Sequence, residues 1–204
     1  MPYQNLTSHT EAELEIKKSR FLAFVRPAQS RDDAHAMISD LKAAYPDARH
    51  VCAAAVFGDP ANATEVLLDD DGEPSGTAAK PMLSALQGRE VGDVCAVVVR
   101  YFGGVKLGAG GLARAYSKAV LMALDTGEFV DFVEQRIVKL KADFALESQL
   151  RYLTESIGSE VLSAHYTNQV SLTIKLTEVQ HAALSALLEP HDANFSEWDK
   201  AEPV

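Results

Sequence analysis

A glycine-rich segment at 101–112 has the residue types best suited to chemistry. It lies between an apolar run and a stretch with helical spacing, and five of nine successive positions are glycine: Gly103, Gly104, Gly108, Gly110 and Gly111. Glycine allows positive φ angles and close approach of a backbone to a ligand, and a helix N-terminus offers free N–H groups to anions. Lys106 lies inside the run, and Arg114 and Lys118 follow four residues apart. The segment therefore suits contact with a phosphate or nucleic-acid backbone. The alternative is a tight strand-to-helix corner that needs small residues for packing.

The spacing of these glycines excludes two common nucleotide-binding motifs. A Walker loop requires G-x-x-x-x-G-K-[ST], and a dinucleotide-binding turn requires G-x-G-x-x-G. The segment 101–112 contains neither pattern. The type of ligand therefore cannot be assigned from a phosphate-loop motif.

An acidic loop at 69–77 is the second candidate, because its many turn-forming residues predict an irregular segment. Asp70, Asp71 and Glu73 could hold a hard divalent metal or contact a partner, although the pattern of an EF-hand loop is not completed. The alternative is a solvated turn. Thr77 is a plausible N-cap for a helix that begins there, and Lys80 adds a cation beside the loop.

Three further groups could take part in catalysis. Ser75 and Lys80 could form a nucleophile–base pair, His50 could act as a general base, and Cys52 has basic neighbours that could activate a thiol. No third partner or oxyanion donor can be assigned to the Ser75–Lys80 pair, and the alternatives for the other two groups are a structural or surface histidine and a buried apolar cysteine. We therefore predict no catalytic residue, no resident metal and no cofactor.

The pattern of the first 134 residues predicts strands that alternate with helices. Two short strands within 11–26, broken near Lys18, precede a helix capped by Ser30. Apolar runs at 51–57 and 94–101 predict buried strands, and helices are expected at 78–86 and from about 112 to 124. Residues 126–134 are the expected linker, although Phe129 and Val130 could add a last strand. This order indicates an α/β or α+β domain.

The remaining chain predicts a second domain at 135–204. Strands are expected at 136–144, 160–166, 169–176 and 194–198, and helices at 148–157 and at 178–188, the latter ended by Pro190. The order βαββαβ is that of the split ferredoxin-like unit. The predicted class is therefore α+β, with two domains at 1–134 and 135–204.

The charge of the chain limits its partners. The net charge is −10, and neither 1–134 (13 basic and 19 acidic residues) nor 135–204 (6 and 10) is basic. A large footprint of phosphate contacts is disfavoured, although a local basic groove can still attract an anion. No run approaches the roughly 20 apolar residues that span a bilayer, and the polar first ten residues lack the apolar core of a secretory signal. Because Cys52 and Cys95 lie in apolar runs, we expect buried thiols in a cytoplasmic protein.

Four blocks of sequence together resemble the IMPACT family, and most closely its bacterial two-domain YigZ-type branch. The blocks are K-K-S-R-F at 17–21, A-R-H at 48–50, D-D-G-E-P-S-G-T-A-A-K-P at 70–81 and R-Y-F-G-G-V-K-L-G-A-G-G-L at 100–112. Ala79 and Val51 depart from residues common at those places. The resemblance implies a first domain related to the second domain of ribosomal protein S5 and a C-terminal domain similar to a late domain of elongation factor G. It also implies contact with nucleic acid or the ribosome and regulation of translation.

Three functions follow as hypotheses. The first is a translation-associated protein that binds RNA or the ribosome, without a chemical step, through the glycine run, Arg100, Lys106, Arg114, Lys118 and Lys80, with Arg20 as a possible extension. The second is a metal-dependent hydrolase or phosphotransfer enzyme that uses the acidic loop. The third is a protein-interaction module whose acidic loop faces a basic partner. Convergence of Asp71, Lys80 and Lys106 in one cleft would indicate a shared site.

Overall fold

The computed structural model describes residues 3–188 and 194–199 of the chain. The protein is a mixed α+β protein, as the sequence predicts. Its internal contacts divide into two compact units, 1–132 and 133–204, here called the N-terminal and C-terminal units. No helix of the described ranges is long and apolar enough to cross a membrane.

The N-terminal unit is built on a five-stranded antiparallel sheet. Its order is β2 (Thr10–Ile16), β3 (Ser19–Pro27), β7 (Val94–Tyr101), β4 (His50–Phe57) and β5 (Glu65–Asp69). The edge strand β2 alternates exposed and buried residues, whereas β4 and β7 are buried along nearly their whole length. The continuous apolar runs that predicted these two strands are thus explained by cover on both faces of the sheet.

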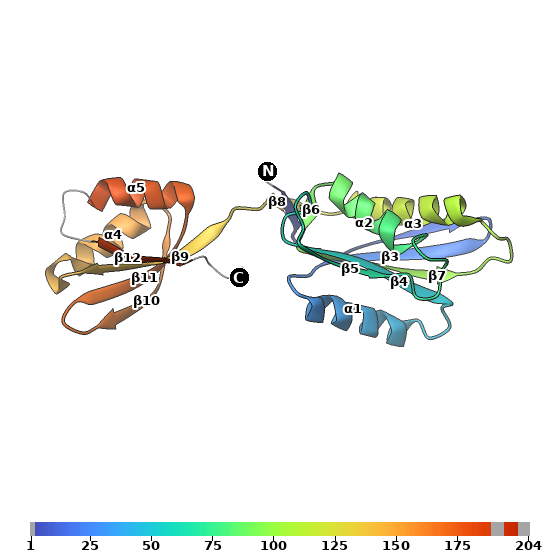
Figure 1. Cartoon of the computed structure of the whole chain (residues 1–204), viewed down its shortest axis with the longest axis horizontal. Coiled ribbons are helices and arrows are strands. Elements are labelled where there is room, and N and C mark those ends of the chain that lie inside the picture. Colours follow the sequence, from blue (N-terminus) through green and yellow to red (C-terminus); the bar gives the residue numbers. More distant parts are fainter. Residues whose placement is uncertain (1–2, 189–193, 200–204) are drawn as a thin grey trace. The chain divides into compact units, whose positions relative to one another are not determined.

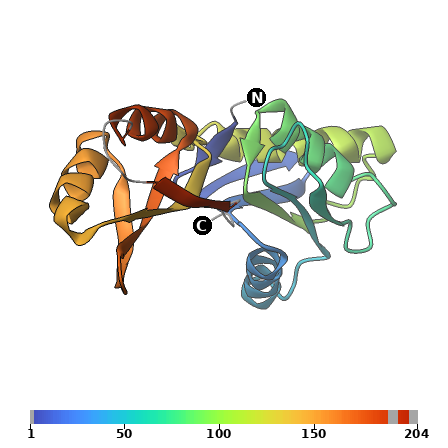
Figure 2. The same ribbon diagram turned by 60° about the vertical axis from the view of Figure 1, so that its left-hand side comes forward.

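Helices cover both faces of this sheet (Figures 1 and 2). Helix α1 (Arg31–Ala44) lies on one face, and α2 (Ala79–Gly88) and α3 (Ala109–Leu124) lie side by side on the other. Ser30 caps α1 in a reciprocal capping box with Asp33, which confirms the predicted start of this helix. Helix α3 begins at Ala109, earlier than predicted, so that Gly110 and Gly111 belong to its first turn.

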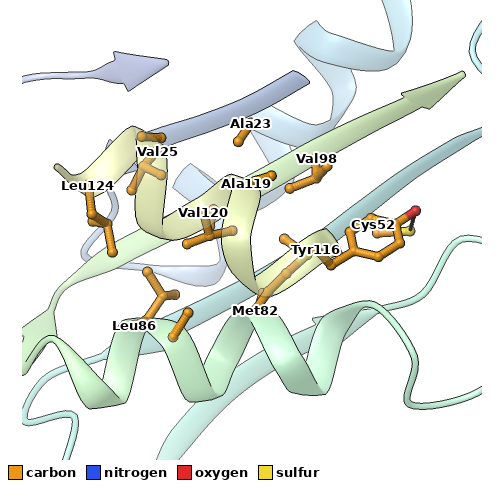
Figure 3. Packing of buried hydrophobic residues seen from close by; sticks show 14 of the residues in the cluster. Ala23, Val25, Cys52, Met82, Leu86, Val98, Tyr116, Ala119, Val120 and Leu124 are labelled. Atoms are coloured by element: carbon orange, nitrogen blue, oxygen red, sulfur yellow. Dashed lines mark hydrogen bonds between the residues drawn. The ribbon is translucent and has the colours of Figure 1, made fainter. Parts of the chain in front are cut away.

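The core beneath α2 and α3 fixes the position of both helices against the sheet. Figure 3 shows Met82 and Leu86 of α2 beside Val120 of α3, with Tyr116 reaching toward Cys52 of β4. All five side chains have no exposed surface. Burial of a large apolar side chain stabilises a fold by about 1.5–3 kcal/mol. Packing of this kind holds the N-terminus of α3 in a constant place at the end of the sheet.

A small sheet closes the N-terminal unit. It consists of β6 (Val91–Gly92), β1 (Gln4–Leu6) and β8 (Phe129–Asp131), in that order. The possible strand at Phe129 and Val130 is therefore present, and it pairs with β1 rather than with the main sheet.

The C-terminal unit has a four-stranded antiparallel sheet with two helices on one face. The sheet order is β10 (Glu160–Tyr166), β11 (Val170–Thr177), β9 (Gln135–Ala142) and β12 (Asn194–Asp199). Helices α4 (Glu147–Ser156), preceded by a short 3₁₀ turn at Phe144–Leu146, and α5 (Glu178–Leu188) alternate with the strands as βαββαβ. Leu150 of α4 and Leu184 of α5 share one core with the alternate residues of β9 and β11. The predicted stop at Pro190 lies outside the described residues.

Candidate functional site

Three segments that are distant in sequence meet at one end of the five-stranded sheet. Because β4 and β7 are antiparallel, the first residue of β4, His50, pairs with Arg100 near the end of β7. The backbone N–H of Arg49 donates to the carbonyl oxygen of Arg100 at 3.2 Å. The acidic loop leaves β5 after Asp69, which pairs with Ala53 of β4. The end of β7, the start of β4 and the acidic loop are therefore neighbours.

These segments line a pocket of about 580 Å³, here called the Arg100 pocket. Its floor and walls come from the start of β4, the acidic loop, the end of β7 and the turn that leads into α3. The lining residues are Arg49, His50, Gly72, Glu73, Pro74, Arg100, Phe102, Lys106, Leu107, Gly108, Ala109 and Leu112. Three cationic side chains and one carboxylate are among them, so the lining has a formal excess of two positive charges.

A buried ion pair forms the floor of the Arg100 pocket. The side chains of Arg100 and Glu73 are 6% and 3% exposed, and Nη1 of Arg100 donates to Oε1 of Glu73. The hydroxyl of Tyr116 donates to the same oxygen at 2.8 Å. The guanidinium also lies over the rings of Phe21 and Phe102, at 5.4 and 5.7 Å from their centroids. Arg100 is therefore held by a carboxylate and two aromatic rings.

One atom of this floor has no hydrogen-bond partner. Nε of Arg100 is buried and unpaired, one of only three such side-chain atoms among the described residues. A buried donor without an acceptor costs about 1–3 kcal/mol, so orphaned donors in a native protein call for an explanation. Arg100 lines the pocket, but because Nε itself has almost no exposed surface, a ligand there reaches Nε only if the guanidinium shifts.

His50 has a fixed ring orientation at the wall of the pocket. Its Nδ1 lies 2.8 Å from the carbonyl oxygen of Asp71. A carbonyl can only accept, so Nδ1 carries the proton and donates it to this oxygen. The opposite nitrogen, Nε2, lies 3.9 Å from Oε1 of Glu73. The hydrogen bond to the loop therefore fixes the orientation of the His50 ring and turns Nε2 toward Glu73.

Cys52 lies behind the pocket and does not line it. Its thiol donates to the carbonyl oxygen of Asp70 at 3.0 Å, and its sulfur lies 3.3 Å from the hydroxyl of Tyr116. Burial raises the pKa of Cys52 to about 12. The pKa of Tyr116 is also raised, mainly by burial and to a lesser extent by its neighbours Cys52 and Glu73. Because only a thiolate is a strong nucleophile, the proposed activation of Cys52 by its basic neighbours is wrong. Cys52 and Cys95 are both buried and free, as predicted.

The carboxylates of Asp70 and Asp71 are used inside the loop itself. Asp70 accepts the backbone N–H groups of Gly76, Ala78 and Ala79 at 2.6, 3.1 and 2.8 Å. Although burial acts in the opposite direction, these three donors hold the pKa of Asp70 below its usual range. Asp70 thus caps the start of α2. The predicted N-cap at Thr77 is wrong, because its hydroxyl donates to the carbonyl oxygen of Pro74 at 2.6 Å.

Asp71 joins the loop to the sheet. Its carboxylate accepts a hydrogen bond from the N–H of Val51 at 2.6 Å. It also forms an ion pair with Nζ of Lys42 at 2.7 Å. Burial raises the pKa of Asp71, but the bonds from Lys42 and Val51 outweigh that effect and lower it. Within residues 3–188, no group of three or more His, Cys, Asp or Glu side chains is arranged to hold a metal ion. The structure therefore gives the acidic loop a scaffolding role.

Replacement of Asp70 by Asn is expected to lower the free energy of unfolding by about 1–2 kcal/mol at pH 7, because the amide cannot accept all three N–H groups. The pKa of Asp70 is lower in the folded than in the unfolded protein, so its stabilisation is complete above the unfolded value of about 4 and is lost as the pH falls through the folded value. Urea unfolding between pH 7 and pH 3 should show the difference from wild type shrinking toward acid. Asp47→Asn, at an exposed carboxylate, is the control, and a constant difference across this range would contradict the assignment.

The glycines of the predicted site serve different purposes. Gly103 packs against the β2–β3 turn, since its N–H donates to Oγ of Ser19 at 3.0 Å and an added Cβ would lie 2.0 Å from the carbonyl carbon of Lys18. Gly104 and Gly108 have φ angles of +86° and +73°, which favour glycine. An added Cβ at Gly111 would meet Leu107 at 3.0 Å. None of these three requirements for glycine, a close contact, a positive φ angle or a clash with Leu107, applies at Gly110.

The structure brings only part of the predicted site together. Arg100, Lys106, Gly108 and Glu73 line the pocket. Lys80, Arg114 and Lys118 are exposed on α2 and α3 and do not line it. Asp71, Lys80 and Lys106 therefore do not meet in one cleft. Arg20, the possible extension, pairs instead with Glu13 at 2.7 Å.

Arg49 and Phe102 are pocket residues that sequence reasoning left out of the site, and it considered His50 only as a general base. Each stands next to a buried strand, at the end that meets the glycine run. This placement was a usable signal, but only once the antiparallel pairing of β4 with β7 is known.

Comparison with known proteins assigns the chain to a family. Residues 17–124 match the Impact N-terminal domain. The chain is 43% identical over 176 residues to an IMPACT family member of Haemophilus influenzae, covering 86% of this chain and 85% of the relative. It is 38% identical over 188 residues to the IMPACT family member YigZ of Escherichia coli, covering 89% and 87%. The chain belongs to the IMPACT family.

Two further relatives extend the match along the whole chain. The IMPACT family member YvyE of Bacillus subtilis is 38% identical over 192 residues, covering 92% of this chain and 81% of the relative. A solved structure described as the crystal structure of a hypothetical protein superimposes with a TM-score of 0.77 at 32% identity, covering 98% of both chains. The resemblance expected from the four sequence blocks is thus confirmed.

Proposed function

We propose that this protein is a translation-associated regulatory protein that binds RNA, alone or on the ribosome, through the Arg100 pocket. Membership of the IMPACT family supports a role in translation. The observation that carries the proposal is the concentration of Arg49, Arg100 and Lys106 around the first turn of α3. Cations and unpaired helix N–H groups are two of the features with which proteins contact phosphates.

The cations at the rim are available to a ligand. Arg49 and Lys106 are exposed, and neither forms an ion pair in the part of the chain that the structure describes. The chain as a whole carries a charge of −10, so this excess of positive charge is local. Local potential, rather than the total charge, guides an anion to a cleft. We therefore expect contact with few phosphates and a correspondingly weak dependence on salt.

The fold supports the same proposal at the level of each unit. The order β10-β11-β9-β12 with βαββαβ connectivity is that expected of a ferredoxin-like domain, which we propose for 135–204. For 1–134 we propose a relationship with the second domain of ribosomal protein S5. Two free buried thiols fit a reducing compartment, and we propose the cytoplasm.

The acidic loop gives less support to the other two functions. The carboxylate oxygens of Asp70 and Asp71 already accept hydrogen bonds from the N–H groups of the segment 76–79, from β4 and from Lys42. Glu73 is buried under Arg100. A metal-dependent hydrolase or an acidic docking loop would instead need carboxylates that face a ligand.

Binding to a short unstructured RNA, measured by fluorescence anisotropy over a range of salt concentrations, tests the proposal. Two or three phosphate contacts predict a slope of log Kobs against log salt of about −1.4 to −2.1, and Lys106→Gln should reduce its magnitude by about 0.7. Arg31→Gln is the matched control. Arg31 lies on α1, which covers the face of the sheet opposite to α3, and it pairs with Glu65. Absence of binding at low salt in the full chain would overturn the proposal.

A further inference from the structure

Gly110 is a glycine that the fold does not require. Its φ angle is not positive, and an added Cβ would meet only the flexible end of Arg114, at 3.5 Å. Glycine in a helix is about 0.5–1 kcal/mol less favourable than alanine. Side chains in a helix tilt toward its N-terminus, so a Cβ in the first turn would narrow the space in front of the free N–H groups. Gly110 does not itself line the Arg100 pocket, so the glycine leaves uncovered the N–H groups of the first turn beside the pocket rather than a part of the pocket wall.

Two further features favour a ligand at the start of α3. The N-cap of α3 is Gly108, which has no side chain to cap the first N–H groups. The unpaired Nε of Arg100 belongs to a side chain that is 6% exposed and lines the same pocket. A helix start without a cap, a nearly buried guanidinium that lines the pocket and a glycine without a local reason all fit an anion that occupies the pocket.

The charge of the pocket favours a doubly charged anion. The lining has a formal excess of two positive charges. A phosphate inside an RNA strand carries one negative charge, whereas a phosphomonoester carries about −1.5 to −2 near pH 7 and offers three strong acceptor oxygens. The pocket thus matches a terminal phosphate better than an internal one.

The pocket also has room and a surface for one nucleoside. Its volume of about 580 Å³ lies within the range of about 300–1,000 Å³ typical of small-molecule sites. Phe102 lines it, and its side chain is exposed although Arg100 lies over its ring. An exposed aromatic ring beside a phosphate site is the usual platform on which a base of single-stranded nucleic acid stacks.

We infer that the Arg100 pocket binds the end of an RNA, taking one terminal nucleotide with its phosphomonoester at the start of α3 and its base against Phe102. The inference rests on the proposed function, because it specifies which part of an RNA the same pocket takes. The strand beyond the terminal nucleotide then lies outside the pocket. A chain with a net charge of −10 needs no long basic track to bind in this way.

Circular RNA separates this inference from the proposed function. One oligoribonucleotide is prepared linear with a 5′-phosphate, linear with a 3′-phosphate, linear with hydroxyls at both ends, and circular. We expect one phosphorylated linear form to bind about tenfold or more tightly than the hydroxyl and circular forms, because charged hydrogen bonds to the terminal phosphate are lost in these. Equal binding of the circular and phosphorylated forms would overturn the inference and leave RNA binding intact. No binding of any form would overturn both.

Variants and small ligands test the two halves of the pocket. Phe102→Ala should weaken the phosphorylated RNA about tenfold and weaken competition by inorganic phosphate much less, because Arg100 keeps its contacts with Glu73 and Phe21. Gly110→Ala should weaken both and keep or raise the melting temperature, with Lys118→Gln on the outward side of α3 as the control. A free nucleoside monophosphate should compete with the RNA for the site. Unchanged affinity of a folded Gly110→Ala protein would overturn the placement of the phosphate.

Discussion

Glu73→Ala is expected to lower the free energy of unfolding by about 3–5 kcal/mol, the largest loss that we expect from a single substitution at the pocket. Glu73 is the partner of Arg100, whose side chain is 6% exposed. Removal of the carboxylate leaves a buried guanidinium without a counter-charge and the hydroxyl of Tyr116 without its acceptor. Both groups then bear a desolvation cost that nothing offsets.

Urea denaturation of the single and double variants would measure this effect. Glu73→Gln should be less severe than Glu73→Ala, because an amide oxygen can still accept from Tyr116. Glu73→Leu combined with Arg100→Met should be more stable than Glu73→Leu alone, since the double variant removes the buried charge as well as its partner. A loss of less than about 1 kcal/mol in Glu73→Ala would contradict this, because it would show that water solvates Arg100 when Glu73 is absent.

The elements of this fold were largely predictable because their periodicity agrees with their burial. The alternation in 11–26, the Ser30 cap and the apolar run that became β7 each identified an element correctly. The short strand β5 was missed, because its five residues hold three apolar side chains and no alternation that differs from a loop. The strands β1 and β6 were also missed, because three and two residues are too few to show any alternation.

The site was only partly predictable because its contacts depend on pairing between distant segments. Glu73 and Arg100 are 27 residues apart, and only the antiparallel pairing of β4 with β5 and β7 brings them together. The sequence shows four acidic residues in the segment 69–77, but not that Asp70 turns inward to cap α2. Charge in a loop is therefore weak evidence for a ligand site until the partners of each carboxylate are known.

Two of the four sequence blocks that resemble the family, at 70–81 and 100–112, have separate physical roles in this structure. The acidic block shapes the floor of the Arg100 pocket, since Asp70 fixes the loop that presents Glu73 to Arg100. The glycine block shapes its wall, because it turns the chain from β7 into α3 and leaves the helix start open. A pocket therefore accounts for both blocks, although neither block alone indicates one.

Gly103→Ala is expected to lower the free energy of unfolding by at least about 2–3 kcal/mol. An added Cβ would lie 2.0 Å from the carbonyl carbon of Lys18 and 2.2 Å from the backbone nitrogen of Ser19. These are backbone atoms of the β2–β3 turn, where Lys18 already has a φ angle of +65°, so they cannot move aside as the end of a side chain can. The substitution would also disturb the hydrogen bond from the N–H of Gly103 to Ser19.

Two neighbouring glycines provide the controls that separate a steric clash from a backbone effect. Gly104→Ala meets no atom within 4 Å but has a φ angle of +86°, so only the cost of a left-handed residue, about 1–2 kcal/mol, is expected. Gly110→Ala meets neither obstacle and should be neutral or stabilising. Thermal unfolding of the three variants should therefore rank Gly103 as the most sensitive position and Gly110 as the least. A Gly103→Ala protein as stable as Gly110→Ala would mean that the β2–β3 turn does not rest against the glycine run, and the wall of the Arg100 pocket would then lose its support from β3.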